Sequence, residues 1–268
     1  MLARMLNAHR AARVTRTSRH RTQLADLPAG LYPYWAASAK NEFPGIASDA
    51  FFFVRAADAL MTFFACVSDS DSACALPSMA ADSVWHAWMR FNSIGLDAFC
   101  VRHFGRAVPH LAAADMASAG ALAACLVKAR RLEGLAPAGP RLPNLFALDR
   151  DARMPGGFGY QGRNGQVAYA RLDQRGRCQD TPAVLDSLTP HTLLETGLIS
   201  PGEHAHWLRR APQSDSGDGA GWIGGDSGSS CSSGGACDSG GADGGCDSGA
   251  SSCGSGGGSS CGSSCGSS

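Results

Sequence analysis

The apolar positions of the chain predict a mainly α-helical body with a three-helix core. Residues 51–67 form the most apolar stretch, and Asp49 stands where the N-cap of a helix over that stretch is expected. Ser78 can cap a second helix, in which apolar residues recur with the spacing of one helical face. An Ala-rich stretch over residues 109–135 predicts a third helix. Together these helices predict a compact domain over residues 31–135.

A different pattern follows the helical domain. Closely spaced prolines mark a linker, and the alternating run 166–172 suits a β-strand. The pairs Thr189-Pro190 and Ser200-Pro201 predict the starts of two more helices. Residues 136–212 are therefore predicted to form a small α+β appendage. Because this segment is poor in large aliphatic residues, we expect it to pack on the helical domain.

The two ends of the chain differ in composition from the body. Residues 1–30 are rich in arginine and predict a basic, flexible N-terminal arm. No aromatic residue is available there for base stacking, so nucleic-acid binding is not expected, and a transit peptide is an alternative. Residues 213–268 consist almost entirely of Gly, Ser, Cys and Asp. Such a segment buries too little apolar surface to offset the entropy of ordering, so a disordered tail is predicted.

Charge and hydropathy bear on location. The neutral chain divides into a basic body and an acidic tail, whose charge we expect chiefly to keep it soluble. Residues 51–67 contain Arg55 and Asp58 and fall short of the roughly 20 apolar residues that span a bilayer. The N-terminal arginines are not followed by the apolar run of a secretory signal. These features predict a cytoplasmic protein, and the frequent use of Arg and Ala is typical of a GC-rich bacterial genome.

Two apparent motifs carry no function. Gly157, Gly159 and Gly162 have the spacing of a dinucleotide-binding loop, but a Pro-Gly turn precedes them and a predicted strand follows. A phosphate-binding loop requires a strand before it and a helix after it, so cofactor binding is not expected there. The sequence at residues 225–228 has the form of a serine-protease nucleophile loop, but it lies in the predicted disordered tail without a scaffold.

The residues that could carry chemistry lie between positions 82 and 110. Asp82 and His86 are four residues apart, so they face each other on a helix. Cys100 and His110 add sulfur and nitrogen donors, with His103 in support. These residue types are the usual protein ligands of zinc, and they form the candidate metal site.

Geometry restricts this candidate. In one straight helix His86 and Cys100 would lie about 21 Å apart, so a shared site requires the chain to turn near residues 92–95. The spacing matches no standard zinc pattern. The alternative is that His86 is a core histidine held by Asp82 and that Cys100 is a small hydrophobic residue.

Other potential ligands are less well arranged. On a helix His204 and His206 point apart by about 200°, which disfavours chelation, and a surface helix end is expected there. The tail cysteines are irregularly spaced and specify neither a zinc finger nor a disulfide framework. They can scavenge soft metals, become cross-linked or carry modifications: Cys231, Cys237, Cys246, Cys253, Cys261 and Cys265.

The motif Asp-x-x-Trp-His, followed by Phe-Cys, Phe-Gly and a histidine, resembles a pattern in the glycine-rich domain-containing protein-like family of bacteria and plants. The resemblance covers about residues 45–115, and the Gly-rich C-terminus agrees with it. In this chain Ala87 and Trp88 stand where that family has a further histidine near His86. The resemblance implies a fold and no established reaction. The matching residues are Asp82, Trp85, His86, Phe99, Cys100, Phe104, Gly105 and His110.

Three functions from different classes are thus open. The leading hypothesis is a non-enzymatic interaction or scaffold module for an unidentified protein partner. The second is a metal-binding protein or metal-dependent hydrolase centred on His86, with Asp82, Cys100 and His110 as further ligands. The third is an exported protein whose cysteine-rich tail is oxidatively cross-linked. No cofactor other than zinc, and no small-molecule substrate, is indicated.

Overall fold

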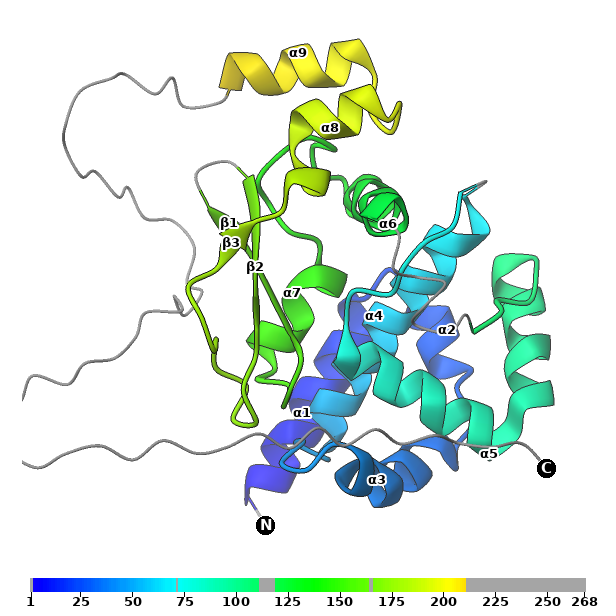
Figure 1. Cartoon of the computed structure of the whole chain (residues 1–268). Coiled ribbons are helices and arrows are strands. Elements are labelled where there is room, and N and C mark those ends of the chain that lie inside the picture. Colours follow the sequence, from blue (N-terminus) through cyan, green and yellow to red (C-terminus); the bar gives the residue numbers. More distant parts are fainter. Residues whose placement is uncertain (1, 71, 111–118, 164–165, 211–268) are drawn as a thin grey trace, which may run out of the picture. The chain divides into compact units, whose positions relative to one another are not determined.

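The computed structural model describes residues 2–70, 72–110, 119–163 and 166–210, and this part of the chain is mainly helical with one small antiparallel sheet (Figure 1). This confirms the predicted fold class, although the predicted disordered tail lies outside the described residues. The helices are α1 Leu2–Thr17, α2 Arg21–Ala25, α3 Leu31–Glu42, α4 Ala50–Ser68, α5 Met79–Phe104, α6 Ala119–Leu132, α7 Asn144–Asp151, α8 Pro190–Glu195 and α9 Pro201–Arg210, with a 3₁₀ turn at Asp186–Leu188.

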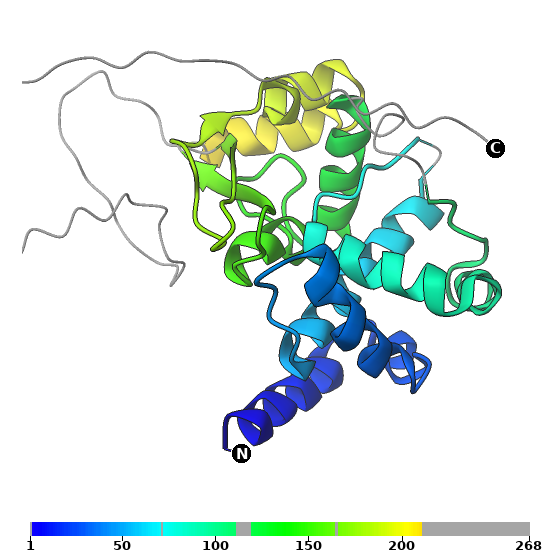
Figure 2. The same cartoon turned by 60° about the horizontal axis from the view of Figure 1, so that its bottom comes forward.

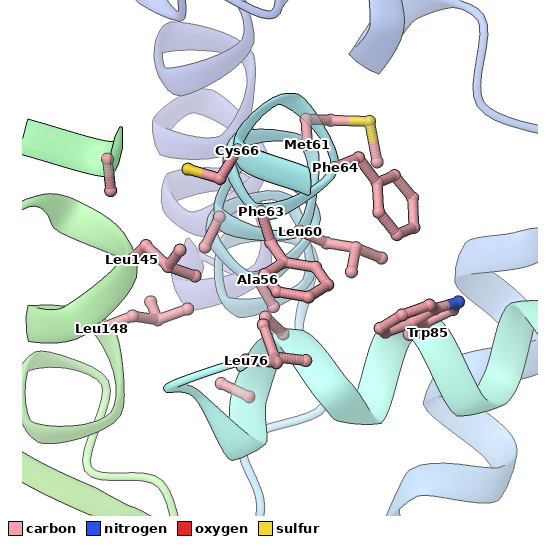
Figure 3. Close-up of a cluster of buried hydrophobic side chains, with 14 of the residues drawn as sticks. Ala56, Leu60, Met61, Phe63, Phe64, Cys66, Leu76, Trp85, Leu145 and Leu148 are labelled. Carbon is pink, nitrogen blue, oxygen red and sulfur yellow. The ribbon is translucent and has the colours of Figure 1, made fainter. Parts of the chain in front are cut away.

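Helix α4 is the centre of the hydrophobic core. As predicted, it begins after Asp49, whose carboxylate accepts hydrogen bonds from the backbone N–H groups of Phe51 and Phe52. The helix contacts α1, α5, α6 and α7, so apolar side chains on several of its faces are buried. Figure 3 shows this cluster, in which Leu145 and Leu148 of α7 approach α4 from one side and Trp85 of α5 from the other.

Further predicted helix starts are confirmed. The Ser78 hydroxyl accepts from the N–H of Ala81 at the start of α5, and the Thr189 hydroxyl accepts from the N–H of Thr192 at the start of α8. Pro201 is the first residue of α9. The third predicted helix corresponds to α6, and residues 111–118 of the predicted range lie outside the described part. Each observed start follows a side chain or proline that suits the first turn of a helix.

The N-terminal segment differs from the prediction of a flexible arm. Residues 2–25 form α1 and α2, and α1 packs along α4 with its first turns extending beyond it (Figure 2). Ala11 of α1 and Leu24 of α2 are buried, and the Ser18 hydroxyl donates to Asp58 of α4. Residues 31–42, for which the apolar pattern predicted no helix within the helical domain, form α3. The N-terminal segment thus packs on α4 through its small and apolar residues. Its arginines were given more weight in the prediction from the sequence, so this contact was not predicted.

The sheet consists of three antiparallel strands in the order β1-β2-β3, with β1 Phe158–Arg163, β2 Gln166–Arg171 and β3 Ala183–Val184. The predicted strand at 166–172 corresponds to β2. Gly159 and Gly162 lie in β1, where a Cβ atom would come within 2.8 Å of the carbonyl oxygens of Ala170 and Pro140, respectively. These glycines permit close backbone packing, which agrees with the rejection of a dinucleotide loop.

The sheet and the helices share one hydrophobic cluster. Helix α7 contacts α4 and β1, and buried residues of the C-terminal part, such as Tyr160 and Leu193, belong to the same cluster as α4. The predicted division at residue 136 remains a prediction, because a shared core is compatible with an appendage that packs on the helices.

Among the described residues, α4 is the one helix that is long and apolar enough to cross a membrane. In its most apolar window of 18 residues, 61% of the residues are buried within the fold. A core helix meets the same criteria of length and composition, so this finding is weak evidence for a membrane span.

A buried carboxylate joins α5, α7 and β1. Asp149, near the end of α7, is fully buried. It accepts hydrogen bonds from the Ser78 hydroxyl at 2.7 Å and from the N–H groups of Met79 at 2.8 Å, Ala80 at 3.0 Å and Phe158 at 2.9 Å. Burial raises the pKa of Asp149, and the four hydrogen bonds oppose that rise. Asp149 therefore fixes the N-terminus of α5 against α7 and the start of β1.

The Asp149→Asn variant should lose about 3 kcal/mol in its free energy of unfolding, because the amide NH₂ would face N–H donors that the carboxylate now satisfies. Urea denaturation followed by circular dichroism measures this loss. The matched control is Asp151→Asn on the same helix, where the side chain is 43% exposed and a change within about 0.5 kcal/mol is expected. Equal stability of the two variants would contradict the structural role of Asp149.

His20 should make the stability of the protein fall at acidic pH. Burial, and secondarily the charge of Arg19, lowers the pKa of His20 to about 4. The folded state therefore binds fewer protons than the unfolded state between about pH 4 and pH 6.5, so stability is complete above that range and is lost as the pH falls through it. The His20→Gln variant should lose about 2 kcal/mol less than the parent chain between pH 7 and pH 4.5 in urea denaturation. The matched control is His9→Gln at an exposed position, which should lose as much stability as the parent chain between pH 7 and pH 4.5.

Candidate metal centre

The candidate site begins on the first half of α5. Asp82 and His86 lie one helical turn apart, and the hydrogen bonds of Asp149 and Ser78 fix the turn that precedes Asp82. Both residues are half-buried, with 25% of the Asp82 side chain and 34% of the His86 side chain exposed. A rigid helix start thus presents a carboxylate and an imidazole on one partly accessible face.

A bend in α5 brings the third residue to this face. The backbone of Asn92 leaves the helical conformation, with φ −166° and ψ 88°, and its side chain accepts from the N–H of Gly95, as a cap of the second half. Gly105 ends the helix in the left-handed conformation, with φ 80°. The chain then returns, so that His110 lies beside the first half of α5. A turn near residues 92–95 was expected only if His86 and Cys100 shared a site, and Figure 1 shows the two segments of α5 on either side of the bend.

The three side chains converge on one point. The Nε2 atoms of His86 and His110 are 3.1 Å apart. Asp82 Oδ1 lies 3.3 Å from His110 Nε2 and 3.6 Å from His86 Nε2. Among the described residues, this is the group of three metal-ligating side chains whose donor atoms all lie within 4.8 Å of one another.

These distances match the geometry of a tetrahedral zinc site. With zinc–nitrogen and zinc–oxygen bonds of about 2.0–2.2 Å, two ligand atoms of a tetrahedron lie about 3.3–3.5 Å apart. The observed separations of 3.1, 3.3 and 3.6 Å bracket that value. The site therefore has the size that three ligands of one zinc ion require.

Trp85 connects the site to the hydrophobic core. Its ring packs edge-on against the His110 ring at a centroid distance of 4.6 Å, and against Phe63 and Phe64 of α4 at 5.5 and 5.2 Å. The fully packed indole thus holds His110 in position from behind. Trp85 and Pro109 also line a cavity of about 450 Å³ beside the site.

Cys100 does not belong to this group of converging ligands. Its side chain is buried in the second half of α5, and burial raises the pKa of its thiol to about 12. A thiol with so high a pKa is a poor metal ligand, because zinc binds the thiolate. The alternative from the sequence, that Cys100 acts as a small hydrophobic residue, agrees better with this position.

His103, which was considered from the sequence as a supporting ligand, interacts with a different partner. His103 Nε2 lies 2.8 Å from a carboxylate oxygen of Asp26, which also accepts from Arg102 at 2.9 Å. The hydrogen bonds from His103 and Arg102 lower the pKa of Asp26. His103 therefore joins the second half of α5 to the end of α2.

A second pair of interacting histidines was not predicted from the sequence. His204 Nε2 lies 3.2 Å from His191 Nδ1, and both rings contact Trp207. The pair joins α8 to α9, and His204 is buried rather than part of a surface helix end. From the sequence, only His206 was considered as a partner of His204 and was rejected, whereas the observed partner lies 13 residues before His204 in the chain.

The sequence model of one protein family, described as UCP032817-like, matches residues 36–180, which is more than half of the chain. The chain belongs to the UCP032817-like family. The resemblance to the glycine-rich domain-containing family is therefore wrong. Three of the eight residues that suggested it, Trp85, Phe99 and Phe104, are aromatic side chains of the hydrophobic core, which a packed helical pair requires for its own stability.

The UCP032817-like family is uncharacterised, so membership assigns no reaction. The matched range includes all three converging residues, Asp82, His86 and His110. Searches of curated proteins and of solved structures found no match. The geometry of the site is therefore the basis on which a function can be proposed.

Proposed function

We propose that the protein binds one divalent transition-metal ion, best fitted by zinc, through Asp82 Oδ1, His86 Nε2 and His110 Nε2. The observation that carries this proposal is the set of three mutual distances, 3.1, 3.3 and 3.6 Å. Two imidazoles and one carboxylate form a nitrogen and oxygen donor set that suits zinc.

The direction of the donor atoms supports a cation at the centre of the group. A neutral imidazole whose proton is on Nδ1 offers the lone pair of Nε2, and here both Nε2 atoms face each other and the same carboxylate oxygen. A proton on one of the two Nε2 atoms can form a hydrogen bond between only two of the three atoms, and the lone pair of the third then has no donor. A cation among them is attracted by all three, and the carboxylate offsets one of its two charges.

The exposure of the site supports access of the ion from solvent. About a quarter of the Asp82 and His110 side chains and a third of the His86 side chain are exposed. Three protein ligands leave a position of a zinc tetrahedron for water, as in zinc sites that are not closed by protein. We infer a site that exchanges its metal with the surroundings more readily than a buried structural site.

The other functions considered from the sequence remain predictions. The interaction or scaffold role was based chiefly on the tail, which lies outside the described residues, as do the tail cysteines of the export hypothesis. The metal-dependent hydrolase would use the same three ligands, with a substrate that the chain does not identify.

Removal of one ligand should weaken zinc binding by about 100-fold or more, because even outer partners of zinc ligands contribute 10- to 100-fold. The parent for this test is the full chain with its six tail cysteines changed to Ser, so that tail thiols do not bind zinc. Competition with a chromophoric chelator measures the affinity, and elemental analysis after gel filtration measures the stoichiometry. One zinc per chain is expected in the parent, and loss of that zinc in His86→Ala, His110→Ala and Asp82→Ala.

The control variants are Cys100→Ala and His103→Ala, which should retain one zinc with unchanged affinity. Affinity in the parent should fall between about pH 7 and pH 5, because protons compete with the metal for imidazole nitrogen. Circular dichroism verifies that each variant is folded. Absence of zinc from the parent, or its retention in folded His86→Ala and His110→Ala variants, would refute the proposal.

A further inference from the structure

Three free cysteines converge at the end of α4, outside the metal site. Cys66 lies in the last turns of α4, Cys74 lies in the segment between α4 and α5, and Cys125 lies in α6. The Cys74 sulfur is 3.9 Å from the carbonyl oxygen of Cys66. The Cys125 thiol is within hydrogen-bonding reach of the sulfur atoms of both Cys66 and Cys74.

Backbone pairing explains why Cys74 and Cys125 meet. The N–H of Ala75 donates to the carbonyl oxygen of Ala121 at 3.1 Å, which joins the segment before α5 to the first turns of α6. Cys125 follows Ala121 by four residues and therefore lies on the same face of α6. Cys74 in the segment before α5 and Cys125 in α6 are therefore brought close together in space.

Cys74 also lines the 450 Å³ cavity that contacts Trp85. Ser70, Ser72 and Arg106 supply polar atoms to its wall, and Phe63 and Val67 supply apolar ones. Although the Cys74 residue is only 5% exposed, the cavity gives a small polar molecule a path to its sulfur. Cys125, in contrast, has no exposed surface and is not among the residues that line the cavity.

The electrostatic surroundings differ among these cysteines. The hydrogen bond from Cys125 lowers the pKa of Cys74, and the Ser70 hydroxyl and the charges of Lys128 and Arg106 lower it further against the effect of burial. Burial raises the pKa of Cys125. The more accessible sulfur is therefore also the one whose thiolate is stabilised, which is the usual arrangement of a reactive cysteine beside a second thiol.

We propose that Cys74 is oxidised by a small hydroperoxide that enters the cavity, and that Cys125 resolves the product as a Cys74–Cys125 disulfide. This redox site is independent of the proposed zinc site, because none of its cysteines is a zinc ligand there. Its substrate class is hydrogen peroxide or a small organic hydroperoxide.

The chemistry consists of two displacements. The Cys74 thiolate attacks one peroxide oxygen, so that an S–O bond forms, the O–O bond breaks, and water or an alcohol leaves after taking a proton. The Cys125 sulfur then attacks the Cys74 sulfur of the sulfenic acid. An S–S bond forms, the S–O bond breaks, and the hydroxyl leaves as water with the Cys125 proton.

The balance is two thiols and one hydroperoxide giving one disulfide, one alcohol or water, and one water. Two molecules of a low-molecular-weight thiol restore the protein by thiol–disulfide exchange and become a disulfide themselves.

A metal site made of the three cysteines fits the structure less well. The described cysteines do not form a group whose sulfur atoms all lie within 4.8 Å of one another, as the zinc ligands do. Instead Cys125 interacts with each of the other two. This pairwise arrangement suits the formation of one disulfide.

The test uses the full chain with its tail cysteines changed to Ser, reduced and then treated with equimolar hydrogen peroxide in the presence of a metal chelator. Alkylation in denaturant and peptide mapping by mass spectrometry should find the Cys74–Cys125 disulfide as the main product. In Cys125→Ser, whose hydroxyl can still donate to the Cys74 sulfur but cannot form a disulfide, dimedone should label Cys74 as a sulfenic acid at a rate about tenfold or more above that of Cys100, whose thiolate is rare.

Matched variants define the roles. Cys100→Ala should form the disulfide at the rate of the parent, and Cys74→Ser should leave Cys125 unoxidised. The mapping of the parent chain needs no substitution at Cys74 or Cys125, so misfolding of a variant does not remove the test. A Cys66–Cys125 disulfide as the main product, or oxidation of Cys125 at an unchanged rate in Cys74→Ser, would overturn the proposal, as would an unmodified Cys74.

Discussion

The buried carboxylate of Asp149 is the constraint on which the arrangement of this protein depends. Its oxygens satisfy the first N–H groups of α5, the hydroxyl that caps this helix, and the first N–H of β1. A carboxylate at the N-terminus of a helix is also favoured by the helix dipole. One residue of α7 thereby fixes the start of α5, and the side chains one and two turns further along, Asp82 and His86, are two of the three residues of the candidate metal centre.

A second level of organisation comes from Trp85. Its indole ring lies between the phenylalanines of α4 and the His110 ring, so the same side chain belongs to the core and supports a proposed ligand. The ring also forms part of the cavity wall from which Cys74 is reached. The two proposed sites therefore use different reactive groups but share one rigid support.

The sequence predicted the elements whose signals are local. Asp49 and Ser78 were recognised as helix caps, and the pair Thr189-Pro190 as a helix start, because these signals act within a single helical turn. The docking of α1 was missed, because contacts such as that of Ser18 with Asp58 join residues 40 positions apart. Asp149 was missed for the same reason, since its partners in α5 are about 70 positions away.

The candidate site could be predicted in part. Asp82 and His86 share a helical face by spacing alone, and His110 was included for its residue type. The bend at Asn92 decides whether His110 or Cys100 lies close to Asp82 and His86. The spacing of apolar residues along α5 does not predict this bend. The convergence of Cys66, Cys74 and Cys125 was not predicted, because the three cysteines lie in different elements. It depends on the hydrogen bond between Ala75 and Ala121, which joins the segment before α5 to α6.

The bend in α5 has a consequence for how an ion would influence the fold. The two histidine ligands are only 24 positions apart, so an ion between them closes a short loop, whose closure costs little chain entropy. An ion bound there would restrict movement between the two halves of α5 and would have little effect on the distant sheet. Scarcity of metal would then loosen a single corner of the molecule, while the remainder stayed intact.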